Sequence, residues 1–154
     1  MVWSTDRIIT ILSMFYIQFI RRYYMTRTYE FLKNAGTFYL ATVDHDQPRV
    51  RPFGAVCIYG GKLYITTSNK KNCFRQMLEN PKVEISGMAG NEWIRLTCEV
   101  VRDESVEAKK AMLEENPSLK SMYAVDDGKF EVLYLKNAAA VFNTFGKEPA
   151  VEKF

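Results

Sequence analysis

The chain has 154 residues, of which 47% are apolar, 25% charged and 14% aromatic; this length suits one domain, and the apolar content excludes a disordered chain. The net charge is +3, and residues 1–24, with three arginines and one aspartate, contribute 3 − 1 = +2 of it. The rest is nearly neutral and lacks the basic surplus of a protein that neutralises many phosphates, so we expect no nucleic-acid partner.

The stretch Ile8–Ile20 is uncharged and mostly apolar. Its 13 residues are too few to cross a bilayer, which takes about 20, and no small-residue cleavage site of a secretory signal follows it. Its polar residues do not gather on one face, as they would in a helix lying on a membrane. Two readings remain for residues 1–24: a helix that docks on the body or on a partner, or a segment outside the functional unit.

We favour the second reading, because Met25 opens a stretch that reads as a complete domain. We therefore expect an N-terminal extension over residues 1–24 and a single domain over residues 25–154. Membrane contact through the extension is a third, weaker hypothesis.

The first half of the body predicts one helix and three strands. Thr28–Asn34 is a short apolar stretch that suits a helix ending near a glycine. Thr37–Val43 is rich in β-branched and aromatic residues and precedes polar turn residues, which is typical of a strand. Arg49–Tyr59 is predicted as the second strand, and Gly60-Gly61 signals a hairpin that leads to a third strand over Lys62–Thr67.

The second half alternates helices and strands. Asn72–Glu79 has apolar residues at helical spacing and ends before a proline, and Ser105 is a suitable cap for a helix over Ser105–Asn116. The strands predicted here are Lys82–Met88, Glu92–Arg102, Phe130–Leu135 and Ala138–Phe142. Hairpins with inserted helices indicate an α+β fold on an antiparallel sheet or barrel, not a doubly wound parallel sheet.

Several kinds of site are excluded by their missing residues. The sequence contains no GxGxxG, GxxxxGK[ST] or GxSxG motif, so it lacks the Rossmann, P-loop and α/β-hydrolase signatures. One histidine and three cysteines without a CxxC pair cannot build a usual zinc site, so we predict no metal. Free cysteines fit a reducing compartment, and we predict a cytoplasmic protein. His45 lies in a predicted turn, and no catalytic side chain is assigned.

The segment after the third predicted strand has the composition of a phosphate site. Residues 66–72 carry hydroxyls, side-chain amides and the pair Lys70-Lys71, directly before a predicted helix. Free N–H groups at a helix start, the helix dipole and a lysine all favour an anion. From this segment alone an ordinary polar loop is an equally good reading. Without Walker glycines, a phosphate site indicates a phosphate-bearing cofactor.

Four sequence blocks occur in register: FYLATVD (Phe38–Asp44), PRVRPF (Pro48–Phe53), GKLYITTS (Gly61–Ser68) and QMLENPKV (Gln76–Val83). In this order and spacing they resemble the pyridoxamine 5'-phosphate oxidase-like family of FMN-binding split barrels, which includes nitroimidazole-resistance and general-stress flavoproteins. The resemblance covers about Tyr29–Phe154 and none of the extension.

The resemblance implies a six-stranded antiparallel split β-barrel with short flanking helices. It implies a homodimer that holds FMN in a groove between the subunits and acts on a small-molecule substrate. The residues it assigns to the cofactor are Arg51, Pro52, Phe53, Gly54, Thr66, Thr67, Ser68, Asn69, Lys70, Lys71, Gln76, Trp93 and Arg95.

The resemblance also suggests what each group would do. The backbone of residues 51–54 would lie along the isoalloxazine edge, and residues 66–69 would meet the ribityl chain and the phosphate. Lys71 best matches the family's phosphate-binding basic residue, with Lys70 as the alternative. Gln76 is a weaker assignment, and Trp93 and Arg95 would reach the flavin or substrate pocket from the partner subunit.

One departure limits the predicted activity. A true pyridoxamine phosphate oxidase carries a C-terminal segment with Arg and His for its substrate, whereas this sequence has no histidine after His45. We therefore expect an FMN-dependent oxidoreductase that acts on another small molecule. The alternative is a non-catalytic module that binds a flavin or another planar cofactor without turnover.

Overall fold

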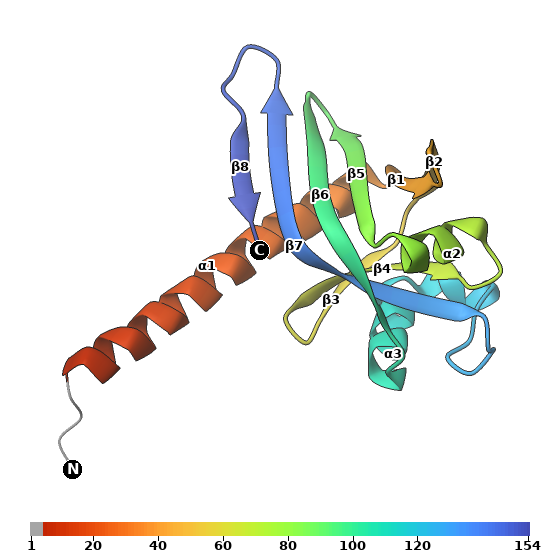
Figure 1. Ribbon diagram of the computed structural model, residues 1–154, viewed down its shortest axis with the longest axis horizontal. Coiled ribbons are helices and arrows are strands. Elements are labelled where there is room, and N and C mark those ends of the chain that lie inside the picture. The colour runs from red at the N-terminus through yellow and green to blue at the C-terminus, as the bar shows by residue number, and fades with distance from the viewer. Residues whose placement is uncertain (1–4) are drawn as a thin grey trace.

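The structure, a computed structural model, describes residues 5–154, and these residues form three α-helices, one 3-10 helix and eight strands (Figure 1). The helices are α1 (Thr5–Ala35), α2 (Asn72–Glu79), α3 (Val106–Glu115) and the 3-10 helix η1 (Pro117–Ser121). The strands are β1 (Phe38–Asp44), β2 (Gln47–Phe53), β3 (Val56–Tyr59), β4 (Lys62–Ser68), β5 (Lys82–Ala89), β6 (Glu92–Asp103), β7 (Phe130–Thr144) and β8 (Ala150–Lys153).

The eight strands form one antiparallel sheet in the order β2-β1-β5-β6-β7-β4-β3, with β8 paired to β7. The sheet does not close, and β2 and β3 lie at its two ends. Strand β7 pairs with β4 through its first residues and with β8 through its later ones, so it joins the two parts of the sheet. The predicted α+β split barrel is confirmed, with eight strands in place of the expected six.

The prediction of one strand over Arg49–Tyr59 was wrong, because this stretch forms two strands, β2 and β3. The chain leaves β2 at Gly54-Ala55 and enters β3, which pairs with β4 at the other end of the sheet. A Cβ atom on Gly54 would lie 3.2 Å from the carbonyl oxygen of Gly36. The crossing therefore brings two backbones close together, which a glycine allows.

The C-terminal strands differ from the prediction in the opposite sense. The two predicted strands around Asn137 are one long strand, β7. Asn137 has a φ of 52°. The register of the β6–β7 pair shifts at this point, between Thr97 and Glu99 of β6. A bulge of this kind bends a strand pair without ending it. The sequence analysis also missed β8.

Two predicted turn signals are confirmed. Gly60 and Gly61 both have positive φ, 55° and 71°, as a two-residue hairpin of the primed type requires. The hydroxyl of Ser105 accepts a hydrogen bond from the backbone N–H of Ala108 at 3.4 Å, so it caps α3 as expected.

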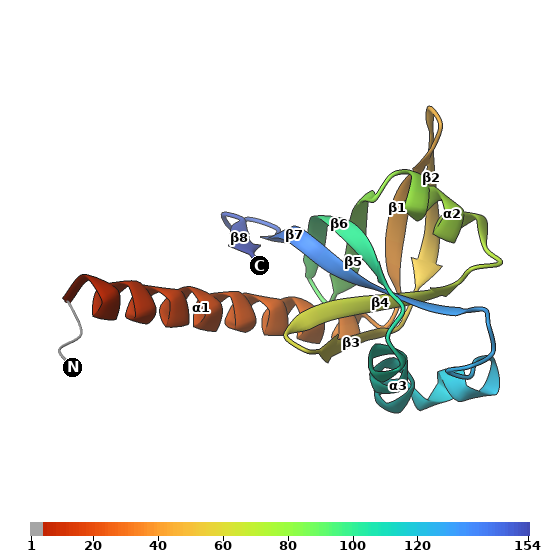
Figure 2. The ribbon, with the colours of Figure 1, turned by 60° about the horizontal axis from the view of Figure 1, so that its bottom comes forward.

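The helix predicted over Thr28–Asn34 is the last part of the 31-residue helix α1, which projects away from the sheet (Figures 1 and 2). From Met25 onward it is anchored: Phe31 and Leu32 are buried, and Arg27 pairs with Glu152 and lies 4.0 Å over the ring of Phe142. In contrast, large apolar side chains between residues 9 and 23 are exposed. No helix in the described range 5–154 has the length and apolar character needed to cross a membrane.

The core has two parts. The larger one fills the barrel under α1 and includes Phe38, Leu40, Ile85 and Leu96, all fully buried. The smaller one packs α3 on β3 and β7. Its buried residues are Ala55, Cys57, Tyr64, Ala108, Met112, Leu113, Phe130 and Val132. Burial of this apolar surface stabilises the crossing after β2 and the α3–η1 segment next to it.

Candidate cofactor site

A cavity of about 330 Å³ lies where the crossing after β2, the end of β4, the start of α2 and the segment around η1 meet. Six residues assigned from the sequence line it: Pro52, Phe53, Gly54, Thr66, Thr67 and Lys71. They come from two separate parts of the chain, residues 52–54 and residues 66–71, and only the fold brings these together. No carboxylate side chain lines this cavity in the described part of the chain.

The other half of the wall was not predicted. It consists of Ala55 and of five residues at the end of α3 and around η1: Asn116, Ser118, Leu119, Met122 and Tyr123. Asn116 ties this segment to the crossing, because its amide donates a hydrogen bond to the carbonyl of Val56 at 3.0 Å. The ring of Tyr123 packs on Phe130 with a centroid separation of 5.0 Å. The apolar and aromatic residues after Pro117 were the available signal for this wall, but such a composition does not indicate which way the segment faces.

The α2 end of the cavity has the properties of an anion site. Lys71 stands at the N-cap position of α2, where no side chain caps the helix. The first N–H groups of a helix lack intrahelical acceptors and carry the positive end of its dipole. The Lys71 side chain is exposed, and no ion pair ties it to a described carboxylate. Lysine and helix N–H groups are thus both available to one ligand.

Three other residues of the predicted phosphate loop shape it and do not line the cavity. The Asn69 amide donates to the carbonyl of Gly128 at 2.9 Å and to Oε1 of Glu131 at 3.2 Å. The Ser68 hydroxyl accepts from the N–H of Lys70 at 3.2 Å, while the Lys70 side chain is exposed. The loop is therefore held by its own side chains and by β7.

Arg51 and Gln76, both assigned to the flavin, bind each other. Nη2 of Arg51 donates to Oε1 of Gln76 at 2.9 Å, and Nη1 donates to Oγ1 of Thr42 at 2.7 Å and to the carbonyl of Leu40 at 3.1 Å. Gln76 is only 3% exposed. Their side chains join α2 to the β1–β2 pair, behind the cavity wall.

Trp93 and Arg95 lie on the outer face of β6, outside this cavity. Trp93 packs on Phe145 with a centroid separation of 4.9 Å, and Arg95 pairs with Glu84 at 2.9 Å. Their assignment to the cofactor rests on a second subunit and stays a prediction.

Cys57 and Cys98 are not nucleophiles. Burial raises the pKa of the Cys57 thiol to about 12, with the charge of Glu115 adding to the effect. Burial does the same for Cys98, whose pKa is also about 12. The thiolate is the reactive form, so both side chains stay protonated and act as core residues.

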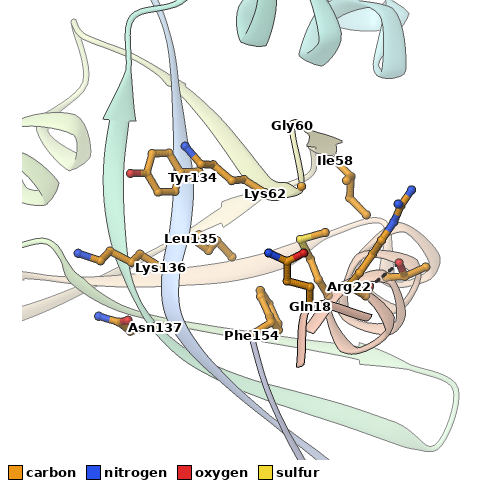
Figure 3. Close-up of a pocket in the computed structure, with 13 residues that line it drawn as sticks. Gln18, Arg22, Ile58, Gly60, Lys62, Tyr134, Leu135, Lys136, Asn137 and Phe154 are labelled. Carbon is orange, nitrogen blue, oxygen red and sulfur yellow. Dashed lines mark hydrogen bonds between the residues drawn. The ribbon is translucent and has the colours of Figure 1, made fainter. Parts of the chain in front are cut away.

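A larger cavity of about 810 Å³ lies between α1 and the β3–β4 hairpin. Three cationic residues line it: Arg22, Lys62 and Lys136. Figure 3 shows that their charged groups point away from one another, and the Lys62 amine lies over the ring of Tyr134, 4.0 Å from its centroid. The cations do not converge on one point, so this cavity is a weaker candidate for a phosphate site than the smaller one.

Comparisons with known proteins agree with the fold. The family model described as "Pyridoxamine 5'-phosphate oxidase" matches residues 26–140. A NimC/NimA family protein from Clostridium acetobutylicum is similar over 89% of this chain and 96% of its own, with 52% identity and a TM-score of 0.87. No curated protein matches the chain.

Two more distant solved structures share the fold. A pyridoxamine 5'-phosphate oxidase-related, FMN-binding protein from Nostoc punctiforme is 17% identical, with a TM-score of 0.57, over 84% of this chain and 94% of its own. A haem-binding protein from Mycobacterium smegmatis is also 17% identical, with a TM-score of 0.63, over 79% of this chain and 57% of its own.

Proposed function

The chain belongs to the pyridoxamine 5'-phosphate oxidase family, and from that premise we propose that it binds FMN in the 330 Å³ cavity and acts as a flavin-dependent oxidoreductase on a small molecule. The observation that carries the proposal is the meeting of Pro52–Gly54, the threonines that end β4, and Lys71 around one cavity. An FMN-binding relative with the same fold supports the choice of ligand.

The lining suits a molecule with an anionic end and a planar end. Lys71 and the first turn of α2 would hold the phosphate, and Thr66 and Thr67 line the wall next to them. Phe53, Leu119 and Met122 supply an apolar wall that an aromatic ring can contact. FMN, when bound, supplies hydride and electron transfer, whereas the protein contributes position and electrostatics.

Strand β2 would contribute its backbone. It stands at the end of the sheet and pairs only with β1, so the groups on its other edge have no partner strand. Unpaired N–H and C=O groups of an edge strand can bond a ligand, and they would address the polar edge of the flavin. The side chain of Arg51 would then support this strand through Gln76 and Thr42 instead of touching the ring.

We further propose a homodimer through the outer face of the sheet. Tyr39 and Met88 are 51% and 59% exposed, although they lie on strands whose alternate residues are in the core. Val50 on β2 and Val151 on β8 are 67% and 57% exposed. An apolar face of this kind is typical of a protein interface. It would bring Trp93 and Arg95 of one protomer toward its partner.

FMN titration tests the proposal directly. Purified protein is titrated with FMN and with riboflavin, which lacks the phosphate, and flavin fluorescence and the visible spectrum are recorded. We expect FMN to bind in a 1:1 ratio to protomers and more tightly than riboflavin. A protein that stays colourless and does not bind added FMN would remove the proposed function.

The alternative is a module that binds a planar cofactor without turnover. Consumption of NADH or NADPH by the FMN-loaded protein with an electron acceptor supports the enzyme, whereas tight FMN binding without reduction by any donor supports the module. Haem is a weaker choice of ligand, because the single histidine, His45, is on the β1–β2 turn with its side chain 83% exposed and lies outside the cavity.

We also propose that the protein works in a reducing compartment such as the cytoplasm. Cys57, Cys73 and Cys98 are all free and buried, and unpaired buried cysteines are typical of proteins that do not meet an oxidising environment.

A further inference from the structure

A buried carboxylate lies beside the proposed phosphate site. Glu131 is 2% exposed and stands directly opposite Thr67 in the β4–β7 pair. Residues directly opposite in an antiparallel pair place their side chains on the same face of the sheet, and Thr67 lines the cavity. The Glu131 carboxylate also accepts a hydrogen bond from Asn69, two residues before Lys71, so a negative charge is held beside the loop that would bind the phosphate of FMN.

This carboxylate is paired with Arg102. Nε of Arg102 donates to one Glu131 oxygen at 2.9 Å, and Nη2 donates to the other at 2.8 Å. Such a two-point contact is the strongest common pairing of arginine with a carboxylate. The guanidinium also lies 5.6 Å from the ring centre of Phe74, in the first turn of α2. Arg102 thus contacts both Glu131 and the first turn of α2.

The same carboxylate holds the loop. The Asn69 amide donates to Oε1 of Glu131 at 3.2 Å, and the Thr66 hydroxyl donates to the Glu131 carbonyl at 2.8 Å. Asn69 is two residues before Lys71, so Glu131 sets the path of the loop that carries the lysine. This support places a buried negative charge near the loop. Among the described residues, Arg102 alone forms an ion pair with that charge.

We propose that Arg102 and Glu131 are positioning residues for the phosphate site: Glu131 fixes the loop through Asn69, and Arg102 cancels the charge of Glu131 so that a dianionic phosphate can bind beside it. This inference rests on the proposed FMN binding. Because buried charges are weakly screened, an unneutralised Glu131 should weaken FMN binding by roughly tenfold or more. It should have no such effect on a flavin without a phosphate.

The experiment compares dissociation constants for FMN and riboflavin in four proteins: the full-length wild type, Arg102→Met, Glu131→Gln, and the double variant. Arg102→Met should weaken FMN roughly tenfold and change riboflavin less than about twofold. Adding Glu131→Gln should restore most of the FMN affinity, because the charge that repels the phosphate is gone. Arg75→Met is the matched control, since Arg75 pairs with Glu79 and Asp44 on the exposed side of α2; it should leave both constants unchanged.

Glu131→Gln alone covers the case in which Arg102→Met does not fold, because Arg102→Met leaves the buried Glu131 carboxylate without its ion-pair partner, which is costly. Gln keeps a hydrogen-bonding side chain and removes one negative charge, while Arg102 keeps its ion pair with Glu104 at 2.9 Å, so FMN should bind more tightly and riboflavin as before. Equal effects on both flavins, or an FMN affinity that Glu131→Gln does not raise, overturn the inference and leave FMN binding standing. A wild type that binds no FMN overturns the proposed function, and the inference with it.

Discussion

Lys71 is the residue on which phosphate binding most directly depends, and Lys70 beside it is a matched control. Charge-assisted hydrogen bonds contribute about 1.5–3 kcal/mol each, so Lys71→Ala should weaken FMN binding by roughly 10- to 150-fold. Lys70→Ala should change it little, because Lys70 is exposed and does not line the cavity. Titration of both variants with FMN and riboflavin is the measurement; a larger loss for Lys70→Ala would move the phosphate contact by one residue.

Glu131 also predicts how stability depends on pH. Burial opposes ionisation of this carboxyl, but the hydrogen bonds and charge of Arg102, with the bond from Asn69, hold its pKa below the ordinary 4.5. A folded-state pKa below the unfolded one stabilises the protein above the unfolded value, and this contribution is lost as pH falls through the folded value.

The wild type should therefore lose more unfolding free energy than Glu131→Gln between pH 5 and pH 3, the range around that ordinary pKa. Urea unfolding of the two proteins at several pH values gives the comparison. Parallel curves would mean that the carboxyl has the same pKa in both states.

Gly54 couples the fold to the cavity. A methyl group there would press against the carbonyl oxygen of Gly36 at 3.2 Å, which forces one of the two backbones to shift. Gly54→Val should lower the melting temperature and weaken FMN binding together, because the crossing is both a structural contact and a cavity wall. Gly90→Val is not a suitable control, because Gly90 has a φ of 61°, at which any other side chain is strained. Val56→Ile, next to the crossing, is a milder comparison. Normal FMN binding in a folded Gly54→Val protein would separate the crossing from the site.

At the scale of elements, α1 raises the question of where the domain begins. The family model begins to match at residue 26, and the anchoring contacts of α1 begin at Met25, which is buried in the core, and continue to Leu32. We therefore predict that a chain beginning at Met25 folds and binds FMN within about twofold of the full chain, since the cavity keeps every lining residue. Circular dichroism melting and FMN titration test this; loss of folding would make the extension part of the domain.

The same pair of proteins tests the exposed apolar side chains of the extension. Ile9, Leu12, Phe15 and Phe19 are 60% or more exposed, and a surface of this kind drives association. Sedimentation of both chains with and without lipid vesicles separates the readings. Pelleting with vesicles by the full chain alone supports membrane contact, and self-association without lipid supports docking on a partner.

For the whole molecule, the outer sheet face predicts the oligomeric state. Met88 lies on that face near the end of β5, directly opposite Trp93 on β6, and is 59% exposed. Met88→Glu should convert a dimer into a monomer and weaken FMN binding, if the partner completes the site through Trp93 and Arg95. Val106→Glu is the control, because Val106 is also exposed but begins α3, away from the sheet face. Sedimentation velocity gives the mass, and a Met88→Glu protein that remains dimeric would place the interface elsewhere.

Most elements follow from local patterns in the sequence, and for a clear reason. The hairpin at Gly60-Gly61, the helix α2 before Pro81 and the capped start of α3 depend on residues within a few positions of one another. The helix-start composition around Lys71 is local in the same sense. The four blocks in register then identified the family, and with it the split barrel, before any contact between distant residues was known.

Tertiary structure decided what depends on contacts between distant segments. The sequence of Arg49–Tyr59 is suitable for one strand, and only the approach of Gly54 to Gly36 and the separate partners of β2 and β3 divide it. The side-chain roles of Arg51 and Gln76 follow from a hydrogen bond between residues that are 25 positions apart in the sequence. The part of the cavity wall around η1 follows from the packing of Tyr123 on Phe130. Likewise, nothing near Glu131 in the sequence indicates that it faces Thr67 and Arg102. Sequence patterns specify the backbone locally, whereas a side chain's partners are set by which strands become neighbours, and that choice is made by burial over the whole chain.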